Sequence, residues 1–66
     1  MLKIEIEQET DGRFIAEIPK LPGVMAYGRN RAEAVATIEA LALLTLADRI
    51  EHAEAVPQLP LIFPAA

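Results

Sequence analysis

The chain has 66 residues, no cysteine, one histidine and a formal net charge of −4 at pH 7. This composition predicts a single domain over residues 1–66, excludes disulfides and most metal-ligand sets, and argues against nucleic acid as a direct partner. A chain this short has room for only a thin core, although 53% of its residues are hydrophobic. We therefore expect it to complete that core by forming oligomers.

The beginning of the sequence has the alternation typical of β-strands. Over residues 2–8 and again over residues 13–18, apolar side chains occupy every second position, which is the period of a strand with one buried face. Thr10, Asp11 and Gly12 separate the two segments with turn chemistry, so we expect an antiparallel hairpin. The polar alternate positions argue against a secretory signal, and no apolar run is long enough to cross a bilayer, so we expect a cytoplasmic protein.

The segment "PKLPG" at residues 19–23 interrupts this pattern. Proline has no backbone N–H to donate, so strand pairing must stop there. Pro22 and Gly23 suit the central positions of a type II turn, because proline presets the first backbone angle and glycine accepts a positive φ. Residues 24–28 then resume as a third strand, which completes an antiparallel meander with one apolar face.

A helix is expected to follow the third strand. Asn30 predicts its start, because the Asn side chain accepts a hydrogen bond from a free N–H of the first turn, and Glu33 has the spacing of a capping box. The helix should extend over residues 31–54 and end before Val56 and Pro57. The stripe predicted to pack on the sheet comprises Ala34, Val35, Ile38, Leu41, Ala42, Thr45 and Leu46.

A second group of apolar residues lies on the opposite side of the same helix, where the sheet cannot cover it. We also expect a short fourth strand at residues 59–63, which the flanking prolines restrict to a sheet edge. Both features indicate contact with another copy of the chain, in a dimer or tetramer. The predicted oligomer interface comprises Ala36, Ala40, Leu43, Leu44, Ala47, Leu59, Leu61 and Phe63.

Four short motifs follow one another in the chain: a strand reading F-x-A-E-x-P, then L-P-G, a strand ending in Gly, and a helix opening x-x-E-A. Their positions are Phe14, Ala16, Glu17, Pro19, Leu21, Pro22, Gly23, Gly28, Glu33 and Ala34. In this order and spacing, residues 2–55 resemble the HicB family of antitoxins and HicB-like proteins. The resemblance implies an α+β fold with the order β-β-β-α-β, in a truncated ribonuclease-H-like arrangement, which agrees with the elements predicted above.

The resemblance also implies a function, namely binding and silencing of a small basic toxin of the HicA type that cleaves mRNA. Many relatives carry a further C-terminal DNA-binding domain, and because the sequence ends at Ala66 we expect a short member without it. Arg29 stands where relatives commonly have an acidic residue, which changes the charge beside the start of the helix. We expect neither enzymatic activity nor a cofactor.

Five side chains are candidates for partner binding: Glu5, Glu7, Glu17, Met25 and Tyr27. The three glutamates share the solvated face of the first two strands, with Lys3 and Arg13 as expected cross-strand partners. Met25 and Tyr27 are out of phase with the buried positions of the third strand and suit interface anchors. The alternatives are a two-metal nuclease site at the glutamates and, for Tyr27, packing against the tail strand or a second subunit.

Asp48 and His52 are four residues apart on the expected helix, a spacing that permits contact. We interpret them as a surface pair rather than an acid–base pair, because the chain has no Ser or Cys nucleophile. The leading hypothesis is thus an antitoxin-type interaction module. The alternative is a stand-alone homo-oligomer that binds a small ligand or acts as a scaffold without a toxin.

Overall fold

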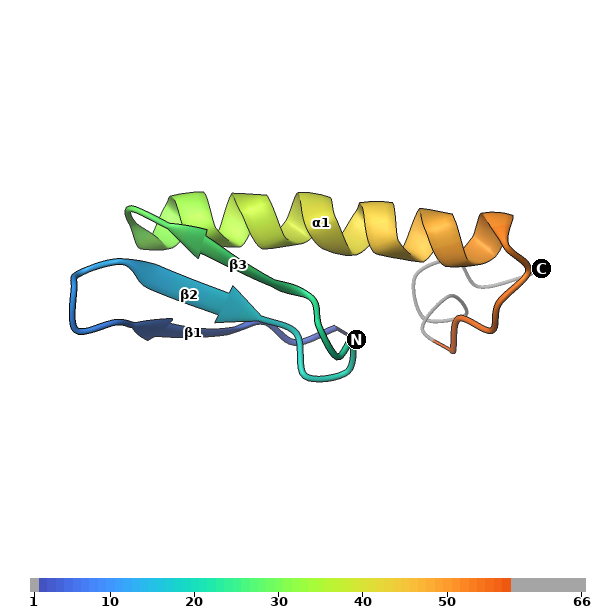
Figure 1. Cartoon of the computed structure of the whole chain (residues 1–66), viewed down its shortest axis with the longest axis horizontal. Coiled ribbons are helices and arrows are strands. Elements are labelled where there is room, and N and C mark those ends of the chain that lie inside the picture. The colour runs from blue at the N-terminus through green and yellow to red at the C-terminus, as the bar shows by residue number, and fades with distance from the viewer. Residues whose placement is uncertain (1, 58–66) are drawn as a thin grey trace.

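The computed structural model describes residues 2–57, which form a three-stranded sheet with one helix packed on it (Figure 1). The strands are β1 (Glu5–Gln8), β2 (Phe14–Glu17) and β3 (Met25–Gly28), and the helix is α1 (Arg31–Glu51). Strand order is β1-β2-β3, and both pairings are antiparallel. The predicted α+β class, with a meander followed by a helix, is confirmed. The predicted fourth strand at residues 59–63 lies outside the described residues.

Each strand is shorter than its alternation predicts. In the register of the first hairpin Glu5 lies opposite Glu17, so the positions before Glu5 would have to pair with Ile18 and Pro19. The chain turns at Pro19 instead, because the N–H of Leu21 donates back to the carbonyl of Ile18 at 2.9 Å. The inward face of β2 is nevertheless as predicted, and both Ala16 and Ile18 are buried.

The loop at residues 19–23 closes with the predicted type II turn. The Val24 N–H donates to the Leu21 carbonyl at 3.0 Å, and Gly23 has a φ of 87°. This geometry turns Leu21 inward, where it is completely buried. Leu21 and Ile38 are the largest fully buried side chains in the described chain, so the loop supplies a central part of the core rather than only a connection.

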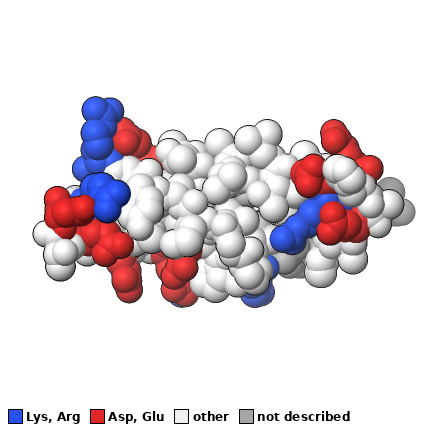
Figure 2. All heavy atoms as spheres, viewed as in Figure 1, with Lys and Arg blue, Asp and Glu red and all other residues white. Residues whose placement is uncertain are grey.

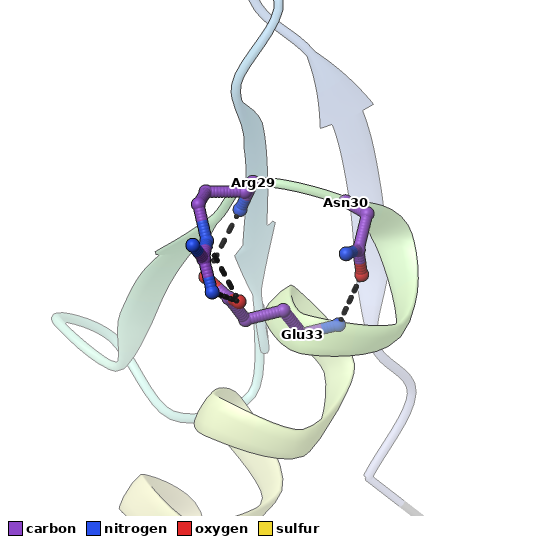
Figure 3. Close-up of polar contacts among 3 residues, drawn as sticks. All are labelled: Arg29, Asn30 and Glu33. Carbon is purple, nitrogen blue, oxygen red and sulfur yellow. Dashed lines mark hydrogen bonds and ion pairs between the residues drawn. The ribbon is translucent and has the colours of Figure 1, made fainter.

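The start of α1 is the predicted one. Asn30 Oδ1 accepts a hydrogen bond from the Glu33 N–H at 2.8 Å (Figure 3). The predicted inward stripe is confirmed, with four residues buried and three half-buried. The first turn lies directly over the end of β3, because a Cβ at Gly28 would overlap the backbone nitrogen of Ala34. Only glycine allows this close approach.

The helix ends three residues earlier than predicted. Ala53 has a φ of 56°, in the left-handed region that ends an α-helix. Its N–H donates to the carbonyl of Ile50 at 3.0 Å, and the Glu54 N–H donates to the carbonyl of Arg49 at 2.8 Å. This is a Schellman motif with alanine at the position that usually holds glycine. It turns the chain back so that Val56 reaches the core.

The helix is much longer than the sheet that supports it. Its 21 residues extend over about 31 Å, whereas strands of four residues cover about 13 Å. The C-terminal half of α1 therefore extends beyond the strands, as Figure 1 shows. In the described part of the chain, α1 lacks the uninterrupted apolar length that a membrane-spanning helix needs.

Candidate protein-interaction site

The outer face of the sheet, which points away from α1, carries the candidate site. Ala16 and Ala26 are register partners and are both buried against the helix, so their strand neighbours point outward. The register forms two outward rows across the three strands. One row is Glu5, Glu17 and Met25, and the other is Glu7, Ile15 and Tyr27.

The acidic half of this face contains two like charges in direct opposition. Glu5 and Glu17 are Cα partners in the β1–β2 pair, and Glu7 follows two residues along the same face of β1. All three are exposed, and within residues 2–57 none of them has an ion-pair partner. Like charges directly opposite one another destabilise a sheet. A cationic group placed over this row would remove that repulsion.

The apolar half of the face lies on β3 and the middle of β2. Met25 and Tyr27 have exposed fractions of 45% and 47%, and Ile15 on the central strand β2 is half-buried. The guanidinium carbon of Arg13 lies 4.5 Å from the centre of the Tyr27 ring, a cation–π distance. The outer sheet face thus combines a large exposed aromatic side chain with free carboxylates.

Arg13 does not neutralise the strand glutamates, contrary to prediction. Its Nε donates to Asp11 Oδ2 at 2.7 Å, and its backbone N–H donates to Asp11 Oδ1 at 3.0 Å. These two hydrogen bonds, the backbone one first, lower the pKa of the Asp11 carboxyl. Arg13 pairs with Asp11 because the tight turn brings a carboxylate two residues away into reach, which leaves the strand carboxylates free.

The structure therefore brings together all five predicted partner-binding residues on one surface. Sequence reasoning missed Ile15 as a member of that surface, whereas Arg13 was expected there. The alternation of β2 was the available signal, because a strand that buries Ala16 must turn Ile15 outward. No three acidic or histidine side chains among residues 2–57 converge as a metal site requires. Glu5, Glu7 and Glu17 form an exposed acidic surface.

The corner between β3 and α1 carries a second charged group (Figure 3). Glu33 Oε1 accepts from the backbone N–H of Arg29 at 3.1 Å, and Oε2 accepts from the Arg29 guanidinium at 3.0 and 3.2 Å. The guanidinium hydrogen bond, followed by the backbone one, lowers the pKa of Glu33, and Glu33 in turn raises that of Arg29. In a standard capping box the Glu33 carboxylate would accept from the backbone N–H of Asn30. Here it accepts from Arg29 instead, because the Arg29 guanidinium adds a positive charge beside it.

The predicted oligomer residues on α1 lie on its outward side. Ala36, Ala40 and Ala47 are exposed, and Leu43 and Leu44 have exposed fractions of 65% and 69%. Leu59, Leu61 and Phe63 lie outside the described residues. A hollow of about 220 Å³ borders Leu43, and its lining comprises Leu2, Ile4, Ile18, Glu39, Ala42, Leu43 and Leu46.

The Asp48–His52 pair lies at the C-terminal end of α1 and is exposed to solvent. His52 Nδ1 is 2.8 Å from the Asp48 carbonyl oxygen and 3.4 Å from Asp48 Oδ1. His52 is also the C-cap residue, and its backbone N–H donates to the same carbonyl. The pair forms part of the helix end, as the surface interpretation predicts.

Compared with protein-family models, with curated proteins and with solved structures, the chain has no match in any of the three. The resemblance to HicB antitoxins therefore stays a prediction from the sequence motifs.

Proposed function

We propose that the protein is an antitoxin-type interaction module whose outer sheet face binds a small basic ribonuclease of the HicA type. The opposed carboxylates of Glu5 and Glu17 are the observation that favours this function most directly. Their mutual repulsion is relieved when a cationic surface covers them, so part of the binding energy comes from removing an unfavourable contact. The net charge of −4 adds attraction over longer distances.

The apolar side chains beside the carboxylates supply the second requirement of such an interface. Tyr27 is a large side chain with few rotatable bonds, and Met25 adapts its shape to a partner. Both are about half exposed on a sheet whose backbone is fixed by two antiparallel pairings. Charges attract the basic partner and apolar anchors slow its release. A ribonuclease bound in this way is inhibited when its RNA-binding surface is covered. The inhibition would take place in the cytoplasm, where mRNA is cleaved.

The alternative function is that of a stand-alone homo-oligomer that binds a small ligand. The apolar hollow beside Leu43, with the carboxylate of Glu39 in its lining, is the observation that favours it. Its volume of about 220 Å³ is below the usual range of ligand sites, about 300–1,000 Å³. The outer sheet face has no role in this alternative, so the two functions make different predictions for the same substitutions.

A binding assay with charge reversal tests the proposal. We expect Glu17→Lys to weaken binding of a HicA-type ribonuclease at least about tenfold, equivalent to about 1.4 kcal/mol. The variant should also no longer inhibit RNA cleavage by that ribonuclease. The matched control is Glu54→Lys, which makes the same charge change on an exposed residue beyond the end of α1. If the two variants bind the ribonuclease equally well, the outer sheet face is not the binding site.

A further inference from the structure

The outward side of α1 carries an apolar stripe with the spacing of a coiled-coil seam. Its residues follow one another at intervals of four, three, four and three, which keeps them on one side of a helix. Leu43 and Ile50 have exposed fractions of 65% and 49%, and the three alanines of the stripe are also exposed. The stripe comprises Ala36, Ala40, Leu43, Ala47 and Ile50.

We propose that this stripe is a self-association surface on which α1 of a second copy of the chain packs in antiparallel orientation. Small and large side chains alternate from Ala40 to Ile50, and reversing the second helix places each large side chain over a small one. Leu43 then packs against Ala47 of the partner subunit, and Ala40 packs against Ile50 of the partner subunit. Two-fold symmetry repeats both contacts, which makes four layers of equal thickness.

Other arrangements of the two helices pack less well. In a parallel pair each residue faces its own copy, so layers of two alanines alternate with layers of two large side chains. In the neighbouring antiparallel register, Ala36 faces Ala47 of the partner subunit, and Ile50 has no apolar counterpart. Interdigitated packing needs alternating large and small residues across the interface. The proposed register supplies them in all four of its layers and leaves only Ala36 outside the contact.

The charge distribution favours the same contact. Residues 40–47 contain no charged side chain, so this part of α1 approaches a second copy without bringing like charges together. In Figure 2, charged side chains gather toward the two ends of the molecule and leave the middle of the visible face largely uncharged.

The exposed area of the chain leaves room for contact with a second copy. A compact protein of 7.2 kDa exposes about 4,100 Å². This chain exposes 4888 Å². The excess of roughly 800 Å² equals the area that each partner buries in a standard protein–protein interface. This excess belongs to the chain as a whole, and a second copy packed on α1 would cover part of it.

The stripe and the outer sheet face lie on opposite sides of the molecule, because α1 packs on the inner face of the sheet (Figure 1). Pairing through α1 therefore leaves both outer sheet faces free. The dimer does not depend on the proposed function, and its failure would not affect the binding of a basic partner to the sheet.

Disulfide cross-linking tests both the contact and its direction, and the absence of native cysteine makes the result unambiguous. We expect a mixture of Ala40→Cys chains and Ile50→Cys chains to form a linked dimer under mild oxidation. Each variant alone should link no faster than Thr10→Cys, which measures random collision from the exposed hairpin turn. Efficient linking of Ala40→Cys alone would overturn the antiparallel direction, and linking of the mixture only at the collision rate would overturn the contact.

A size exchange within one layer tests the register. Leu43→Ala and Ala47→Leu should each raise the dimer dissociation constant at least tenfold, as measured by sedimentation over a range of concentrations. The double variant Leu43→Ala/Ala47→Leu keeps one large and one small side chain in the layer, so it should recover most of the loss. Both positions are exposed in the single chain, and circular dichroism checks that each variant folds. A monomeric wild-type chain at submillimolar concentration, or a double variant weaker than both single variants, would contradict the proposal.

Discussion

Gly28 marks the point at which helix and sheet come closest together. A side chain at this position would overlap the backbone of Ala34, with 2.8 Å between the added carbon and the Ala34 Cα. Backbone atoms cannot move aside as a flexible side chain does, so the first turn of α1 would have to lift from β3. The absence of a side chain at Gly28 thus allows α1 and β3 to lie this close together.

Gly28→Ala should therefore lower the free energy of unfolding by about 3 kcal/mol, the upper end of the range for overpacked sites. Urea denaturation measures this loss. Gly12→Ala is the comparison, because Gly12 has open space around it and a φ of 93°, so only backbone strain of about 1 kcal/mol applies. Equal losses in the two variants would show that α1 does not press on Gly28.

Ala53 offers the opposite experiment, because it holds a left-handed conformation that costs an L-residue about 1 kcal/mol. Ala53→Gly should raise the free energy of unfolding by that amount, visible as a higher urea midpoint. Ala55→Gly, at an exposed site that has no positive φ, should change stability by no more than about 0.5 kcal/mol. A destabilised Ala53→Gly variant would mean that the helix does not end in this motif.

At the scale of elements, how well the sequence predicts a feature depends on whether a local pattern encodes it. Alternation placed Ala16 and Ile18 in the core, and the side chain of Asn30 marked the start of α1. The end of α1 was predicted wrongly, because alanine carries no signal for the left-handed conformation at Ala53. The burial of Leu21 was also missed, since periodicity carries no information inside a five-residue loop.

Leu21→Ala measures how much the loop contributes to the core. The side chain is fully buried, so its removal should lower the free energy of unfolding by about 2–5 kcal/mol. The neighbouring Lys20 is exposed, and Lys20→Ala should lie within about 0.5 kcal/mol of the wild type. A small loss in Leu21→Ala would indicate that the loop is not anchored in the core.

The charged corner at the start of α1 should make stability depend on pH. Hydrogen bonds from Arg29 lower the pKa of Glu33 in the folded state, so the unfolded chain takes up the proton first as the pH falls. The contribution of Glu33 is fully present at neutral pH and is lost as the pH falls through the lowered pKa. Glu33→Gln should therefore flatten the acid limb of a urea-midpoint profile, and an unchanged limb would contradict the role of this pair.

At the scale of the whole molecule, the chain is a thin two-layer structure with extents of 45 × 21 × 16 Å and two unlike free surfaces. One is the acidic outer face of the sheet with Met25 and Tyr27, and the other is the apolar stripe on α1. Composition alone predicted that a chain this short would bind other copies of itself. The surface that suits a basic partner could be located only from the register of the strands. That register pairs Glu5 with Glu17 and so shows where the like charges meet.

Chemical-shift mapping tests the central claim most directly. A ¹⁵N-labelled chain titrated with a catalytically inactive HicA-type ribonuclease should show its largest shifts in β1, β2 and β3, with α1 residues 40–50 unchanged. The side chains of Met25 and Tyr27 should shift with the sheet amides. Shifts confined to α1, or the absence of any shift at concentrations that saturate binding of a known antitoxin, would contradict the assignment of the outer sheet face.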